Sequence, residues 1–164
     1  MHKSEQTSPA LIGLIFVYTA GSALGIWVAS GNVSTLAGAL QAAGISNRFP
    51  LALSAVIPLF AVYLVTLLHL PGLIFPILFL KAATDSFLML GICAAYGNAA
   101  WLAGALLLFS DKIATVFLIY FAGKCLVKPQ QSHSACFLSV LIAIALMIAV
   151  DHFHIAPYFS YLIL

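Results

Sequence analysis

Charged side chains are scarce in this sequence of 164 residues: they make up 6% of the chain, whereas hydrophobic residues make up 64%. Soluble domains carry roughly 25% charged residues. A water-soluble fold of this size still exposes about a third of the surface of its unfolded chain, so it cannot hide this much apolar surface. The scarcity of charge therefore excludes an ordinary soluble domain and predicts that the lipid bilayer surrounds most of the chain.

Other features are also missing, and each absence excludes a class of function. The net charge of +2 is too small to indicate nucleic acid or an acidic partner. The three cysteines, Cys93, Cys125 and Cys136, have no CxxC spacing, so we expect neither a disulfide framework nor a metal site. The chain also lacks GxSxG, HExxH, Walker-type and DxD motifs. We therefore expect a protein that is not an enzyme and that needs no cofactor.

What the chain does contain is a series of long apolar runs. Crossing about 30 Å of hydrocarbon takes about 20 helical residues, and a helix satisfies its own backbone groups there. We therefore predict an all-α fold, a single integral membrane domain over residues 1–164 with about five transmembrane helices. The predicted helices span residues 10–29, 51–68, 73–95, 99–125 and 136–155. The first run is longer than the 7–15 residues of a signal-peptide core, so we expect a membrane helix there, with a cleaved signal peptide as the alternative.

The fourth predicted helix contains a polar interruption at Ser110, Asp111 and Lys112. This segment either crosses the membrane fully or breaks and folds back at that point. With a full crossing, Lys3, Lys124 and Lys128 lie on one side of the membrane and only Arg48 lies on the other. Because cytoplasmic loops are enriched in Lys and Arg, we expect a multi-pass protein of the cell membrane with a cytoplasmic N-terminus.

Four charged residues lie inside the apolar runs: Lys81 and Asp85 in the third run, Asp111 and Lys112 in the fourth. An isolated charge at the bilayer centre costs about 2.5–3.5 kcal/mol. Lys81 and Asp85 are four residues apart and share a helix face, and the simplest arrangement places Asp85 near Lys112 and Lys81 near Asp111. We predict an intramembrane polar cluster that fixes helix register. The alternatives are an ion or substrate path and a surface that docks a partner.

Small residues form a second pattern. Gly21 and Gly25 make a GxxxG step in the first run, and Ala82 and Ser86 have the same spacing in the third. Such steps let the backbones of membrane helices approach closely. We expect these four residues to pack helices within the chain, with a homo-oligomer as the alternative.

Taken in order, several landmarks resemble the stage II sporulation protein M family. The first run carries Phe16 followed by spaced small residues, and Phe79-Leu80-Lys81 with Phe87 is similar to the family's F-L-K-G-x-x-x-G-F run. The last run also resembles the C-terminal end of the family, through Phe137-Leu138, Met147-Ile148-Ala149, Phe153 and Pro157. The chain departs from the family pattern at Ala82 and Ser86, where glycines are usual.

The resemblance implies a non-enzymatic membrane scaffold that assembles with peptidoglycan hydrolases during sporulation and engulfment. The charged cluster supports a different hypothesis, in which the chain is a small transporter component. The substrate-binding subunit of an energy-coupling-factor system is one example of such a component.

Overall fold

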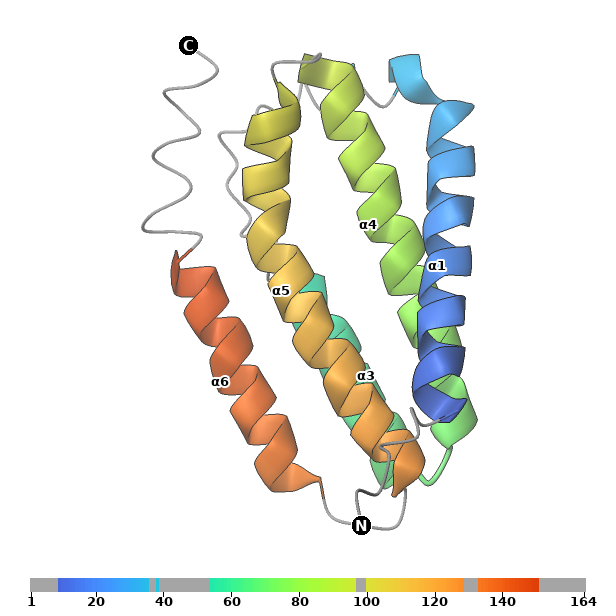
Figure 1. The fold of residues 1–164 in the computed structure, drawn as a ribbon, viewed down its shortest axis with the longest axis vertical. Helices are drawn as coiled ribbons and strands as arrows, with labels where there is room; N and C mark the ends of the chain where they lie inside the picture. Colours follow the sequence, from blue (N-terminus) through green and yellow to red (C-terminus); the bar gives the residue numbers. More distant parts are fainter. Residues whose placement is uncertain (1–8, 36–37, 39–53, 97–99, 129–132, 151–164) are drawn as a thin grey trace, which may run out of the picture.

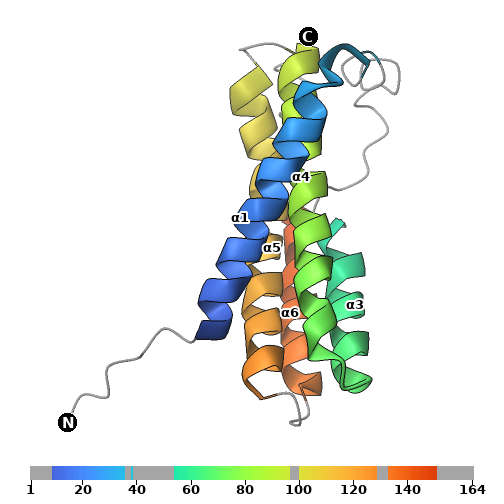
Figure 2. The same ribbon diagram turned by 90° about the vertical axis from the view of Figure 1, so that its right-hand side faces the viewer.

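The computed structural model describes residues 9–35, 38, 54–96, 100–128 and 133–150. All regular elements in these ranges are helical, which confirms the all-α class. The main ones are α1 (Pro9–Ser30), α3 (Val56–Leu67), the short 3-10 helix η2 (Pro71–Leu73), α4 (Ile74–Tyr96), α5 (Ala100–Val127) and α6 (Ser134–Val150). In Figure 1, α1, α4, α5 and α6 follow one another across the bundle, and α3 lies behind α5. The turned view in Figure 2 shows α1 crossing in front of α4 and α5.

The helices that correspond to the first and third predicted runs differ from them by one residue at each end, α1 at Pro9–Ser30 and α4 at Ile74–Tyr96. The second predicted helix is shorter in the structure. After one 3-10 turn at residues 54–55, α3 has 12 residues, a rise of roughly 18 Å. Residues 51–53 and 151–155, which the prediction assigned to helices, lie outside the described residues.

The fourth predicted helix is continuous, so the alternative of a break at residues 110–112 is not found. Helix α5 has 28 residues and passes through this point without interruption. Asp111 and Lys112 meet side chains from other helices, so their polar groups are paired without opening the backbone ladder of α5.

Two of the described helices are long and apolar enough to cross a membrane, one at Pro9–Ser30 and one at Pro71–Ala94. Helix α3 and the apolar part of α6 at Ser134–Ala149 are shorter. The structure therefore supports the apolar, helical character of the chain, while a five-span topology remains a prediction.

A tight turn reverses the chain between α3 and α4. His69 has a φ of 57°, its N–H donates to the Thr66 carbonyl at 3.1 Å, and the N–H of Leu70 donates to the Val65 carbonyl at 3.0 Å. These two bonds form a Schellman motif, in which glycine is the usual left-handed residue. Pro71 then begins η2, and a proline soon after such a cap prevents the helix from continuing.

Replacing His69 with glycine should therefore stabilise the protein by about 1 kcal/mol, since the left-handed conformation is costly for a residue with a Cβ. The matched control is Leu68→Gly, one residue earlier, where φ is −80° and glycine should destabilise by up to about 1 kcal/mol. Unfolding in mixed micelles, followed by far-UV circular dichroism, measures both. A loss of stability in both variants would contradict this account of the turn.

The apolar core lies where α3, α5 and α6 meet α4 and α1. Its largest fully buried side chains include Leu14, Leu59, Leu78, Phe121 and Ile144. Aromatic rings extend this core toward the end of the bundle where α5 leads into α6. There the ring of Tyr63 stacks on Phe137 with centroids 4.2 Å apart.

Candidate functional site: an intramolecular charge cluster

Helices α1 and α4 approach closely through the GxxxG step. A Cβ atom on Gly21 would lie 3.0 Å from the Cβ of Ala82 and would clash with the carbonyl oxygen of Phe79. A Cβ on Gly25 would clash with the carbonyl oxygen of Ala83. Ser86 is half-buried and is not among the atoms nearest to either glycine. Three of the four predicted packing residues, Gly21, Gly25 and Ala82, therefore lie at this contact.

Gly25→Ala should destabilise the bundle by about 1–3 kcal/mol, the usual cost of overpacking, because a backbone carbonyl cannot rotate away as a side chain can. Gly13→Ala is the matched control on the same helix. Its Cβ would lie 3.6 Å from the Phe75 ring, an ordinary contact, so it should be neutral or stabilise by up to about 1 kcal/mol. Unfolding in mixed micelles compares the two variants, and equal effects would show that the close approach is absent.

Lys81 lies at the centre of the charge cluster. Its ammonium donates to Asp111 Oδ1 and to the Ser54 hydroxyl, both at 2.8 Å, and also to Asp85 Oδ1. The Ser54 hydroxyl in turn donates to Asp111 Oδ1 at 2.6 Å. The Lys81 side chain is only 2% exposed. All three N–H groups of the ammonium thus have an oxygen partner, and this buried charge is fully paired.

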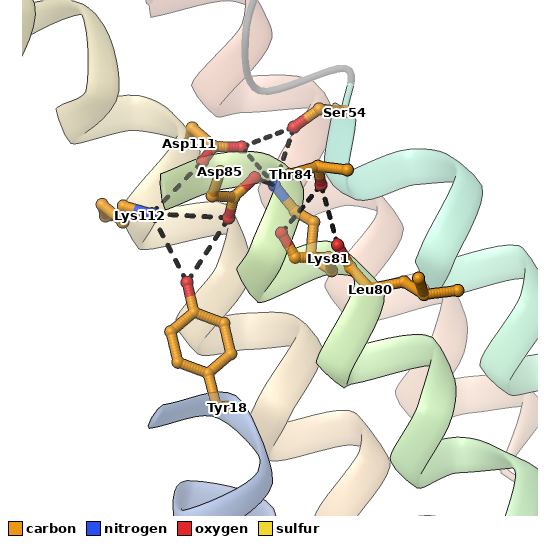
Figure 3. A network of polar contacts seen from close by, with 8 residues as sticks. All are labelled: Tyr18, Ser54, Leu80, Lys81, Thr84, Asp85, Asp111 and Lys112. Atoms are coloured by element: carbon orange, nitrogen blue, oxygen red, sulfur yellow. Dashed lines mark hydrogen bonds and ion pairs between the residues drawn. The ribbon is translucent and has the colours of Figure 1, made fainter. Parts of the chain in front are cut away.

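Lys112 reaches the same two carboxylates from the other side (Figure 3). Its Nζ lies 3.4 Å from Asp85 Oδ2 and 3.9 Å from Asp111 Oδ2. It also lies 3.4 Å from the hydroxyl of Tyr18, which donates to Asp85 Oδ2 at 3.4 Å. The Lys112 side chain is 41% exposed. The cluster therefore holds two positive and two negative charges and has no net charge.

The structure brings together all four charged residues predicted for the cluster, in the predicted pairs Lys81–Asp111 and Asp85–Lys112. Sequence reasoning missed Tyr18, near the middle of α1, and Ser54, in the turn before α3. Their only sequence signal is a hydroxyl inside an otherwise apolar run. With them, the cluster links α1, α4 and α5 to the turn that begins α3.

The charged groups of this cluster pair with one another. Among the residues that the structure describes, no three His, Cys, Asp or Glu side chains lie close enough to hold a metal ion. Comparisons of the chain with protein-family models, with curated proteins and with solved structures find no match. Function must therefore be argued from the bundle and its charges.

Proposed function

We propose that the chain is a multi-pass protein of the cell membrane that acts as a non-enzymatic scaffold for peptidoglycan-remodelling enzymes. The membrane placement is supported by the outer surface of the helices. Each of the α-helices exposes large apolar side chains, among them Phe16 and Trp27 on α1, Ile57 on α3, Leu80 on α4, Val116 on α5 and Leu146 on α6. Soluble monomers rarely expose contiguous apolar patches larger than a few hundred Å², whereas lipid covers such a surface without cost.

Exposed hydroxyls on these helices also fit a lipid environment. Thr19 donates to the Ile15 carbonyl at 2.8 Å, and Ser139 donates to the Ala135 carbonyl at 2.9 Å. Thr84 bonds in the same way to a carbonyl of the preceding turn. In hydrocarbon a free hydroxyl has no water partner, and these internal bonds remove that cost.

One observation above all supports the scaffold assignment: the buried charged side chains pair with one another. Lys81, Asp85 and Asp111 are buried and hold α4, α5 and the start of α3 together. This arrangement stabilises a bundle and leaves its outer faces and loops for partners. The resemblance of the sequence landmarks to the stage II sporulation protein M family supports peptidoglycan hydrolases as those partners.

The scaffold proposal is tested in the host organism. Deleting the gene should impair engulfment, observed by fluorescence microscopy of stained membranes. The tagged full-length chain, purified in detergent, should carry a peptidoglycan hydrolase with it. Normal spores after deletion, together with no hydrolase in the purified complex, would overturn the proposal.

The orientation is a separate prediction. The start of α1 and the end of α5 lie at the same end of the bundle (Figure 1). Lys124 lies in the last turn of α5, and Lys128 directly follows the helix in the sequence. A cytoplasmic N-terminus places these lysines in the cytoplasm. Lys128→Cys should react with a membrane-impermeant maleimide only after permeabilisation, and Asn98→Cys, between α4 and α5 in the sequence, should react in intact cells. The reverse pattern would contradict this orientation.

A small transporter component is the second candidate, favoured by the exposure of Lys112 on an otherwise buried cluster. Uptake assays with Asp85→Asn and Asp111→Asn distinguish the two functions. Loss of uptake in folded variants supports transport, while impaired assembly without any change in uptake supports the scaffold. Neighbouring genes give a further distinction, since sporulation genes favour the scaffold and a pair of ATPase genes favours transport.

A further inference from the structure

One face of α5 stays exposed from the middle of the helix to its C-terminal end. Val116 and Tyr120 are 65% and 53% exposed on this face, and Lys124 and Lys128 are exposed as well. Each of these residues lies four positions after the one before it, so their side chains follow one another along the helix surface. This exposed stripe, formed by Val116, Tyr120, Lys124 and Lys128, therefore changes from aliphatic to aromatic to cationic toward the end of α5.

Tyr120 and Lys124 lie together where the apolar part of the exposed stripe meets the charged part. The ammonium of Lys124 lies 5.4 Å from the centre of the Tyr120 ring, which is within the range of a cation–π contact. Tyrosine is enriched where membrane helices meet the lipid headgroups, because its ring is apolar and its hydroxyl is polar. The order of side chains in the stripe thus matches the order of groups in a lipid molecule, from acyl chain to headgroup.

The charges of Lys124 and Lys128 are not paired inside the fold. The only acidic residues that the structure describes are Asp85 and Asp111, and both pair within the charge cluster. Two carbonyls at the end of α5 are satisfied without the ammonium groups. The Lys124 carbonyl accepts the N–H of Lys128 at 3.2 Å, and the Lys128 carbonyl accepts a bond from Nε2 of His133 at 2.8 Å. Within the described part of the chain, these two neighbouring cations therefore have no acidic partner.

We propose that the exposed stripe binds an anionic phospholipid. The phosphate of the headgroup pairs with Lys124 and Lys128, and an acyl chain lies along Tyr120 and Val116. Charge complementarity selects the headgroup, because lysines close to a membrane attract anionic lipids, whereas a zwitterionic lipid has no net charge to attract. The apolar end of the stripe selects a lipid over a wholly polar acidic peptide, which would leave Val116 and the Tyr120 ring uncovered.

The depth of the charge cluster is consistent with a headgroup at Lys124. Lys112, the member of the cluster on α5, precedes Lys124 by three steps of four residues, a rise of about 18 Å. Half of the hydrocarbon thickness of a bilayer is about 15 Å. With the ammonium of Lys124 at the headgroups, the cluster therefore lies close to the bilayer centre, where unpaired charge is most costly.

This inference rests on the membrane placement proposed above and is independent of the scaffold role. A cytoplasmic N-terminus puts the start of α1, and with it the end of α5, on the cytoplasmic side (Figure 1). The lipid then comes from the inner leaflet. An acidic segment of another protein is the competing occupant of the two lysines, and the experiment below distinguishes it from a lipid.

Quenching by brominated lipids of a tryptophan in the exposed stripe tests the proposal. The full-length chain carrying Val116→Trp, Trp27→Phe and Trp101→Phe is reconstituted in phosphatidylcholine bilayers. Equal fractions of brominated phosphatidylglycerol or brominated phosphatidylcholine are then added to separate samples. We expect the brominated anionic lipid to associate at this tryptophan about fivefold more strongly than the zwitterionic one, the contribution of about one lysine near a membrane surface.

Variants of the two lysines show whether they cause the preference. Lys124→Gln combined with Lys128→Gln should abolish it, while Lys124→Arg combined with Lys128→Arg should preserve it. Phe16→Trp, in a chain with the same two tryptophan replacements, is the matched control. Phe16 is 73% exposed on α1, which contains no lysine or arginine, so both brominated lipids should quench this tryptophan equally.

The possible outcomes separate this inference from the membrane placement. Equal quenching of Val116→Trp by the two lipids would overturn the headgroup site, leave the lysines to an acidic protein segment and leave the membrane placement intact. A preference that survives the two glutamine substitutions would also overturn the site. Quenching of neither tryptophan by either lipid would overturn the membrane placement and the inference with it. Should the glutamine variant fail to fold, salt decides: the preference must weaken as NaCl is raised, and a preference unaffected by salt would contradict the proposal.

Discussion

Lys81→Met is expected to destabilise the bundle by about 3–5 kcal/mol, the usual cost of removing one partner of a buried ion pair. The substitution leaves the carboxylates of Asp85 and Asp111, which are both buried, without their shared partner. It also leaves the Ser54 hydroxyl without its donor. Unfolding in mixed micelles, followed by circular dichroism, gives the change in stability.

Two control variants show whether the loss comes from unpaired charge. Lys112→Met removes the same charge from a side chain that is 41% exposed, so it should cost only about 1 kcal/mol or less. The triple variant Lys81→Met, Asp85→Asn, Asp111→Asn removes the buried charges together and should recover part of the stability, since no buried charge is then left without a partner. If Lys81→Met and Lys112→Met cost the same, the buried lysine is not the centre of the cluster.

Leu80→Asp is expected to cost about 2.5–3.5 kcal/mol, the penalty for a carboxylate near the bilayer centre. Leu80 precedes Lys81 and therefore lies at the depth of the cluster, but its side chain is 63% exposed. In water, an exposed leucine replaced by aspartate changes stability by no more than about 0.5 kcal/mol. The substitution thus separates a lipid-covered surface from a hydrated one.

Val127→Asp provides the comparison for Leu80→Asp. Val127 is also exposed, but it is the last residue of α5 and is followed by Lys128. Near the membrane surface the cost of a charge falls sharply, so this variant should accumulate in membranes almost as the wild type does. Immunoblots of membrane fractions and unfolding in micelles measure both variants. Equal tolerance of the two substitutions would contradict lipid around α4.

Some members of the charged cluster could be predicted from the sequence, and others could not. Lys81 and Asp85 could be placed on one face of a helix from their spacing, and the cost of burying charge required partners for both. Tyr18 could not be predicted, because its contact with Asp85 depends on how α1 crosses α4 in three dimensions. The same limit applies to Ser54, which is 57 residues from Asp111 in the sequence and bonds to it in the fold.

The helices, like the cluster, could be predicted from the sequence only in part. The lengths of α1 and α4 follow from apolar runs that are bounded by prolines and small polar residues. The continuity of α5 could not be decided from the sequence, because the segment at Ser110, Asp111 and Lys112 is compatible with a break when it is considered alone. Asp111 and Lys112 pair with residues of other helices, and this tertiary pairing removes the reason for a break. The local pattern of apolar residues therefore predicts which segments are helical, and pairing with distant residues decides whether α5 continues through its polar segment.

Fluorescence quenching in lipid tests most directly whether acyl chains cover the helices. Phe16 is 73% exposed in the middle of α1, and Phe16→Trp, combined with Trp27→Phe and Trp101→Phe, leaves it as the single tryptophan. In bilayers of lipids brominated in the middle of their acyl chains, we expect strong quenching of this tryptophan and little quenching by aqueous iodide. Strong quenching by iodide with none by the brominated lipid would show that water covers this surface.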